Sequence, residues 1–361
     1  MDGDDPLRQE EAHRYGRARR RLGAADGVVS LIALALVAAA AGSLGGWGSL
    51  AALVVVPTLV SLPFAYAGWR LSRAYGLSRQ TVGGWLADRA KGLAVGLVLG
   101  GLAAAGVLLL QRASDDWWPL WVWIGGLLLS AALSLLFPVL LLPLFLKSEP
   151  LPDGPLADAL WQTVRTAGIA VRELRLLHLG EKTSAGNAMV AGIGPTRRIY
   201  VGDTLSEDAD EDERIDETCV VLAHELGHHV HGDPWRMLAF SAIGLGVGVA
   251  GAALAVAAWA PDGAGHLNSL PALVLGFSVA SALASPLSGW YSRRRERAAD
   301  AYAVRVTGRG EVFARALERL CAQNLSELRP PRLWHALTAS HPMPCERIAA
   351  ARATRQAAVQ D

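Results

Sequence analysis

Cysteine and lysine are scarce in this sequence of 361 residues, and the scarcity of cysteine argues against a small disulfide-rich secreted protein. The three cysteines, Cys219, Cys321 and Cys345, form no Cys-x-x-Cys pair and are too few for a disulfide framework. They favour a reducing environment around the polar regions. The net charge is +1 and no basic stripe with interleaved aromatic residues occurs, so nucleic acid is excluded as a partner.

Hydrophobic residues, in contrast, are abundant. They make up 52% of the chain, whose mean hydropathy of +0.28 exceeds that of an ordinary soluble domain. Apolar runs long enough to cross a bilayer, about 20 residues each, lie near 27–46, 48–69, 92–111, 119–146, 237–260 and 269–290. We predict six crossings, about four within residues 27–147 and two within 236–290, in a multi-pass protein of the cell membrane that contacts the lipid bilayer.

Basic residues mark one side of the predicted membrane region. Six arginines precede the first run and five basic residues lie between positions 70 and 91, whereas the loops of the opposite side contain only Arg112. Cytosolic loops of membrane proteins are enriched in lysine and arginine. We therefore expect the N-terminal segment 1–26 and the two polar regions, 148–235 and 291–361, to lie on the cytosolic side.

The strongest motif is H-E-x-x-H, formed by His224, Glu225 and His228 within an apolar segment that is compatible with a helix. Residues four apart lie on nearly the same helix face, so both imidazoles can reach one ion, and tetrahedral zinc is bound by such pairs. Glu225, about 100° further round the helix, can take a proton from zinc-bound water as a general base. The motif predicts one catalytic zinc ion per chain.

A structural zinc site is the alternative interpretation of the motif. Such a site usually has four protein ligands, often with cysteine. Cys219 lies five residues before His224 and so about 140° away on a helix, which favours a core position. We expect His231, two turns beyond His224, to be a cation at the end of the helix rather than a ligand.

A catalytic zinc site requires a third protein ligand, and the distance of each candidate residue from His224 along the sequence limits the choice. The metzincin pattern would place a histidine ten residues after His224, but that position is Pro234. After the last apolar run, Glu296 and Asp300 stand four residues apart in a basic segment. We predict that Glu296 is the third zinc ligand and that Asp300 orients a ligand imidazole, although such a pair also occurs as a surface salt-bridge motif.

The polar region 148–235 also predicts a small sheet beside the motif helix. The predicted elements are a helix at 153–170, strands at 174–179, 188–194 and 198–201, a turn at 194–197, and a solvated acidic loop at 207–217 that leads into the motif helix. The fold class is mainly α, with polytopic membrane helices. A zincin-type H-E-x-x-H catalytic domain, formed by 148–235 and completed by 291–361, contains the small β-sheet.

These motifs resemble those of the M48 zinc metallopeptidases. His-Glu-Leu-Gly-His at 224–228 and Glu-Arg-Ala-Ala-Asp-Ala-Tyr-Ala at 296–303 look like the signatures of that family. The Ste24-like CAAX prenyl protease branch is the more similar one, because segments 75–81, 184–192 and 202–205, and Ser340-His341-Pro342 with Glu346-Arg347, resemble its motifs. The resemblance covers about residues 70–350, although the chain is shorter than the eukaryotic enzymes.

The resemblance implies further roles. Asn187 would bind the substrate backbone, and the strand that begins at Ala188 would pair with an extended peptide. His341 and Arg347 would stabilise the oxyanion of the intermediate or the substrate carbonyl. The resulting function is a membrane-embedded zinc metalloendopeptidase for peptides or proteins, including membrane-associated ones.

Two alternatives stay open. His-Gly-Asp at 231–233 also resembles the related HtpX-like branch of membrane quality-control proteases. A catalytically silent zinc-containing scaffold or transporter is the alternative from another class, and the intact Glu225 argues against it, because a structural site needs no base.

Overall fold

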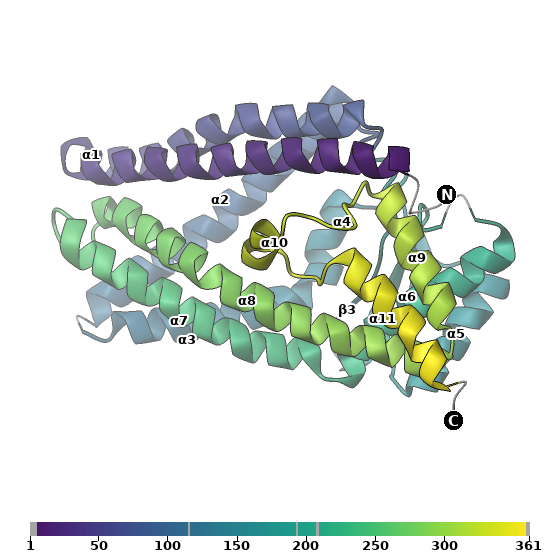
Figure 1. The fold of residues 1–361 in the computed structure, drawn as a ribbon. Helices are drawn as coiled ribbons and strands as arrows, with labels where there is room; N and C mark the ends of the chain where they lie inside the picture. Colours follow the sequence, from purple (N-terminus) through teal and green to yellow (C-terminus); the bar gives the residue numbers. More distant parts are fainter. Residues whose placement is uncertain (1–5, 115, 193, 207–208, 359–361) are drawn as a thin grey trace.

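The computed structural model describes residues 6–114, 116–192, 194–206 and 209–358. Long helices form an elongated bundle at one end, and a small sheet with shorter helices forms the other end (Figure 1). The helices are α1 (Pro6–Ala74), α2 (Val82–Ala113), α3 (Trp118–Leu136), α4 (Leu142–Phe145), α5 (Pro155–Ala167), α6 (Glu211–Val230), α7 (Asp233–Trp259), α8 (Leu270–Thr307), α9 (Gly310–Gln323), α10 (Arg332–Thr338) and α11 (Pro344–Ala358). A π-helical turn at Phe137–Leu141 joins α3 to α4, and 3₁₀ turns lie at Gly194–Thr196 and Leu267–Ser269. The mainly α fold class with a small sheet is confirmed.

Five helices in the described part of the chain are long and apolar enough to cross a membrane. The six predicted runs all lie within them, because α1 contains the first two. Gly45, with φ of +64°, bends α1 into two arms, a backbone conformation that glycine adopts without a steric penalty. The arms run back along each other (Figure 1), and the Ser61 hydroxyl of the second arm donates to the Asp26 carboxylate of the first.

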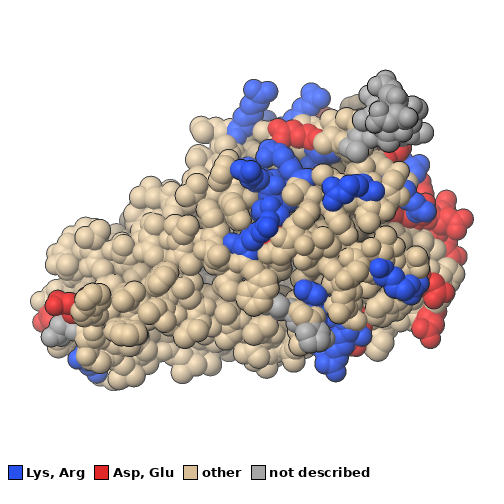
Figure 2. Space-filling view, turned by 90° about the horizontal axis from the view of Figure 1, so that it is seen from below, with Lys and Arg blue, Asp and Glu red and all other residues tan. Residues whose placement is uncertain are grey.

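The surface reflects this division of the molecule. Figure 2 shows lysine, arginine, aspartate and glutamate gathered over the end that contains the sheet, while the bundle is almost free of charge except at its far tip. Many large apolar side chains of the bundle are exposed, among them Leu102 at 68% and Leu283 at 79%. Contiguous apolar surface of this kind is stable against lipid but costly in water.

The sheet has the order β1-β2-β4-β3, with β1 at Ser148–Pro150, β2 at Glu173–Leu177, β3 at Ala188–Ala191 and β4 at Arg198–Gly202. β2 and β4 are parallel, and the other pairs are antiparallel. The strand predicted at 188–194 is shorter than expected, because Gly192, with φ of +95°, turns the chain away from the sheet. β1 was not predicted, since three residues carry too little alternation to be recognised.

α6 lies at the centre of this end of the molecule. On one side its Leu222 and Leu226 are fully buried against α5 and the sheet, with Leu160 and Ile199. On the other side Val220 packs with Phe313 of α9. Burial on both sides explains why the H-E-x-x-H segment is so apolar, and it holds the helix rigidly between two layers.

α1 is continuous through residue 26 and α8 through residue 290, so both helices extend from the apolar runs into the polar segments. The acidic loop predicted at 207–217 is wrong for 211–217, which form the first turns of α6, while residues 207 and 208 lie outside the described part. Asp210 caps this helix by accepting from the Glu213 amide, and Glu217 is buried against Arg319.

The packing of α7 on α8 yields a test of the fold. A Cβ atom at Gly276 would lie 2.3 Å from the Gly251 carbonyl oxygen, so Gly276→Ala forces the two helices apart. We expect it to lower stability by about 1–3 kcal/mol, measured as the apparent melting temperature in detergent. Gly244→Ala on α7, whose Cβ would meet nothing within 4 Å, is the control and should not lower it. Equal melting temperatures for the two variants would contradict the packing.

Candidate metal centre and active site

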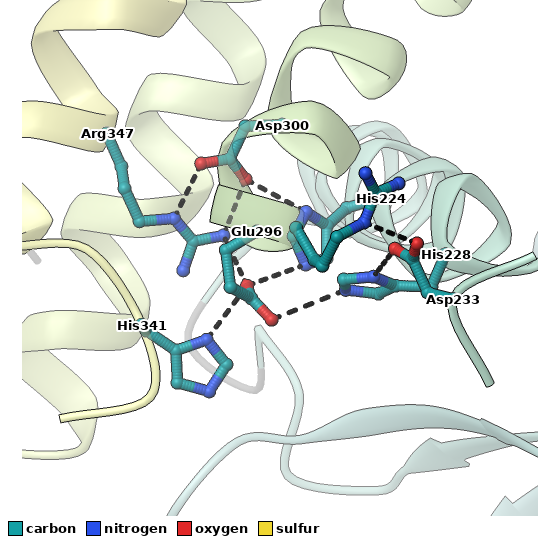
Figure 3. Close-up of polar contacts among 8 residues, drawn as sticks. His224, His228, Asp233, Glu296, Asp300, His341 and Arg347 are labelled. Atoms are coloured by element: carbon teal, nitrogen blue, oxygen red, sulfur yellow. Dashed lines mark hydrogen bonds and ion pairs between the residues drawn. The ribbon is translucent and has the colours of Figure 1, made fainter. Parts of the chain in front are cut away.

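α6 and α8 bring two imidazoles and one carboxylate together. The Nε2 atoms of His224 and His228 each lie 3.4 Å from an oxygen of Glu296, and one ligand atom from each of the three residues lies within 4.8 Å of the others. Figure 3 shows the three side chains pointing toward one another. His224 and Glu296 are buried, and His228 is partly buried. The arrangement is the donor set of a catalytic metal site with two histidines and one glutamate.

Local sequence explains how the two helices come so close. Gly227 lies between the two histidines on α6 and faces α8, where a Cβ atom would approach the Ala299 Cα at 3.3 Å and the Tyr302 ring at 3.0 Å. Small residues at a helix crossing let the backbones approach each other. Glycine at position 227 and alanine at 299 therefore allow the carboxylates of α8 to reach the imidazoles of α6.

A second carboxylate holds the remaining nitrogen of each imidazole. Asp300 lies 2.9 Å from Nδ1 of His224, as its spacing from Glu296 predicts. Asp233 lies 2.9 Å from Nδ1 of His228 and accepts a hydrogen bond from Arg295 on α8. Such contacts fix the orientation of each ring, with Nε2 directed toward Glu296.

Asp233 was missed by the sequence analysis. The residues Gly232-Asp233 were noted only as a similarity to one family branch, without a role. Gly232, with φ of +67°, ends α6 and lets the chain turn, so that Asp233 at the start of α7 lies beside the last turn of α6. The sequence did contain a signal for this contact, namely a carboxylate five residues after the second histidine and directly after a glycine that can end the helix.

His341 and Arg347 both reach this centre. His341 Nδ1 lies 2.8 Å from Glu296, and the His341 side chain is 60% exposed. Arg347 forms a bidentate ion pair with Asp300 at 2.7 and 2.8 Å, and it lies 4.0 Å from Glu296. The Arg347 guanidinium therefore stabilises the carboxylate that orients His224, a contact that the sequence did not predict.

One face of α8 contacts the segment that contains His341 and Arg347. Gly289, Arg293, Glu296 and Asp300 are spaced three or four apart and so share that face. Arg293 donates to the carbonyl oxygens of Ala339 at 2.5 Å and Ala336 at 3.3 Å. The absence of a side chain at Gly289 leaves room for the Ala339 carbonyl. α8 thus positions the chain on both sides of His341.

Burial and charge shift the pKa values of the α6 side chains. Burial disfavours protonated His224, but the carboxylates of Asp300 and Glu296, 2.9 and 3.4 Å from its two nitrogens, outweigh it and raise the pKa of His224 to about 9. Burial also raises the pKa of Glu225, while the neighbouring histidines oppose that shift. The pKa of His229 is lowered to about 4 by burial and by Arg197. His229 is therefore neutral at pH 7.

The predicted substrate residues lie at the edge of the sheet. Asn187 is exposed, and its backbone carbonyl accepts from the Gly202 amide. Successive residues of a strand direct their backbone groups to opposite sides, so those of Ala188 and Val190 point to the outer edge of β3. α6 packs against this strand, and its His229 accepts a hydrogen bond from Arg197 at 3.1 Å. β3 thus presents its outer edge directly beside the helix that carries the two histidines.

Cys219 and His231 lie outside the centre. Cys219 is buried in the hydrophobic core with Leu222, as predicted. His231 is the C-cap residue of α6, and its ring lies against Tyr302. Within the described residues, His224, His228 and Glu296 form the group of side chains suited to a metal ion.

Comparisons with known proteins agree with this geometry. Residues 156–355 match the profile of peptidase family M48, which covers both polar regions of the site. This chain belongs to peptidase family M48. Residues 37–147 match the N-terminal region of the CAAX prenyl proteases, described as five membrane helices.

Relatives of the M48 chain occur in bacteria and eukaryotes. It is 30% identical to the uncharacterized metalloprotease YhfN of Bacillus subtilis, over 82% of this chain and 70% of that one. It is 28% identical to CAAX prenyl protease 1 of Saccharomyces cerevisiae, over 81% and 69%. The crystal structure of S. mikatae Ste24p has the same fold, with a TM-score of 0.77 at 21% identity over 96% of this chain and 89% of that one. The M48 chain is thus a multi-pass membrane metalloprotease related to the CAAX prenyl proteases.

A substitution of Asp233 tests whether its carboxylate supports His228 as a metal ligand, a role that the H-E-x-x-H motif alone does not suggest. Asp233→Asn removes the negative charge that holds His228 Nδ1, and we expect zinc affinity to fall about 10–100-fold, measured by competition with a chelator. Asp216→Asn is the control, because Asp216 pairs with Arg309 at the exposed surface of the same helix. Unchanged affinity in Asp233→Asn would show that this carboxylate does not support the metal ligand.

Proposed function

We propose that this M48 protein is a zinc endopeptidase whose single zinc ion is held by His224, His228 and Glu296. The supporting observation is the convergence of three donor atoms within 4.8 Å from two helices. Asp300 and Asp233 support the fit, because each holds the imidazole nitrogen that faces away from the centre. When bound, zinc polarises the scissile carbonyl and lowers the pKa of the attacking water.

Glu225 acts as the general base in this proposal. It follows His224 directly, so its carboxylate lies beside the ligands rather than among them. Because burial raises its pKa, the carboxylate is a stronger proton acceptor than one in water. Its oxygen takes the proton of the attacking water and then passes it to the leaving amine.

The substrate is an extended peptide that adds a strand to the sheet. The outer edge of β3 supports this step, since Ala188 directs its backbone groups outward and exposed Asn187 stands at the start of the strand. His341, on the exposed side of Glu296, stabilises the developing oxyanion. Arg347 contributes through its positive charge 4.0 Å from Glu296 while it orients Asp300.

Sequence relatives named CAAX prenyl proteases favour a Ste24-like processing enzyme over an HtpX-like quality-control protease. Because the site lies beyond one end of the helical bundle, we expect it at the bilayer surface, where peptides and membrane-associated proteins are accessible. The arginines that precede the first apolar run support a cytosolic orientation of the catalytic region.

Two variants separate chemistry from metal binding. Glu225→Gln keeps the size of the side chain but removes the base, so zinc should stay near one ion per chain while peptide cleavage falls about 10²–10⁴-fold. His224→Ala should lose zinc and cleavage together. Zinc content by mass spectrometry and cleavage of a quenched fluorescent peptide in detergent measure both. Glu225→Gln that cleaves at the wild-type rate with full zinc would contradict the role of Glu225 as the general base, whereas wild-type protein that cleaves no peptide with full zinc would favour the silent scaffold.

Single cysteines test the orientation. Cys219 and Cys321 are buried, so Cys345 is first replaced by serine to give a background without accessible thiols. Ala264→Cys and Asp212→Cys, both exposed, stand at opposite ends of the molecule. In intact cells, an impermeant maleimide should label position 264 and leave position 212 unlabelled until the membrane is opened. The reverse pattern would place the catalytic region outside.

A further inference from the structure

A cavity of about 1000 Å³ lies between the two arms of α1, the start of α2 and the catalytic region. It is bordered by Arg19, Arg89, Trp69, Ala185 and Ala339, among others. We call it the basic pocket. None of the proposed metal ligands or catalytic residues borders it.

The cations of the basic pocket are not all neutralised. Arg20 is paired with buried Glu327, and Lys182 is paired with Asp88 at 2.5 Å. Arg19 instead contacts the hydroxyl and ring of Tyr15, and Arg89 lies 5.6 Å from the ring centre of Trp85. Within the described residues, neither Arg19 nor Arg89 has a carboxylate partner. Two guanidinium groups are thus available to an anion.

A third donor lies in the same wall. Trp69 is 93% buried, and its Nε1 has no hydrogen-bond acceptor within the described part of the chain. A buried N–H without an acceptor costs free energy that a ligand oxygen would recover. The rings of Trp69 and Trp85, 5.8 Å apart, add an apolar surface. The pocket therefore suits an anionic group attached to an apolar or peptide chain.

The basic pocket continues the substrate path. Ala185 stands two residues before Asn187, at the amino end of β3, and Ala339 stands two residues before His341. A peptide that is paired with β3 and extends past the amino end of that strand therefore enters the pocket. This continuity favours a substrate segment over a lipid headgroup as the occupant.

We propose that the basic pocket binds a carboxylate of the substrate peptide, with Arg19 and Arg89 as its cationic contacts and Trp69 as an N–H donor. The carboxylate belongs either to an acidic side chain or to the C-terminus of the peptide, since the two present the same chemistry. The pocket thereby selects substrates by charge on one side of the scissile bond. This inference rests on the proposed peptidase function and on strand addition at β3.

The test compares matched peptides. A cleavage site is first mapped in casein, and peptides spanning it are made with Asp or Asn at successive positions and with a free or amidated C-terminus. At one of these positions, the wild-type enzyme should have a KM about 10-fold lower for the peptide with the carboxylate than for its neutral partner. Arg19→Gln and Arg89→Gln should lose that preference, because cleavage of the acidic member falls by more than cleavage of the neutral member. Arg17→Gln, on an exposed face of α1 outside the pocket, is the control.

A binding measurement keeps the test independent of turnover. The same peptides, labelled with a fluorophore, are titrated against zinc-loaded Glu225→Gln by anisotropy, alone and combined with Arg19→Gln. Equal affinity for acidic and neutral members in all pairs would overturn the basic pocket as a carboxylate site. Loss of cleavage of every peptide, with the charge preference in binding retained, would instead count against the proposed chemistry.

Two further outcomes would also overturn the proposal. If Arg19→Gln and Arg89→Gln weaken the acidic and neutral peptides equally, these residues serve the structure and not selectivity. If the variants abolish a dependence of activity on anionic lipid in nanodiscs while peptide charge has no effect, the pocket holds a lipid headgroup.

Discussion

The close approach of α6 and α8 is the constraint on which the rest of the site depends. Where Gly227 meets Ala299, the two backbones come near enough for the short carboxylate side chains of one helix to reach the imidazoles of the other. A Cβ atom at position 227 would lie 3.3 Å from the Ala299 Cα and so would force the two helices slightly apart. The contacts of Glu296 and Asp300 with the two imidazoles lie at this crossing, and Arg347 of α11 adds its contact with Asp300 there.

α8 is one continuous helix from Leu270 to Thr307, so it connects the apolar bundle directly to the candidate metal centre. Its first part packs against α7 in the bundle through glycines, and its last part carries Glu296 and Asp300. The positions of Glu296 and Asp300 therefore depend on how α8 packs in the bundle. Arg293 on the same helix holds the segment that brings His341 back to Glu296.

The surroundings of the centre define a path for an extended chain. β3 is an edge strand of the sheet and lies against α6. An edge strand beside a metal site can align a peptide backbone without regard to sequence, because backbone hydrogen bonds are common to all peptides. Selectivity then has to come from pockets for side chains and charges, and the basic pocket lies at the end of this path.

Local patterns in the sequence determined the long apolar helices, the H-E-x-x-H helix, the small sheet and the membership of the M48 family, because hydrophobic runs and residues four apart on a helix depend only on neighbours in the chain. The approach of Glu296 and Asp300 to the two histidines was also predicted, since residues four apart lie on one helix face. Only the tertiary structure decided that Asp233 holds His228, that Arg347 holds Asp300, and that β3 is an edge strand beside α6. Each of these depends on how segments far apart in the sequence pack, and packing distances are not encoded in the spacing of residues along one segment.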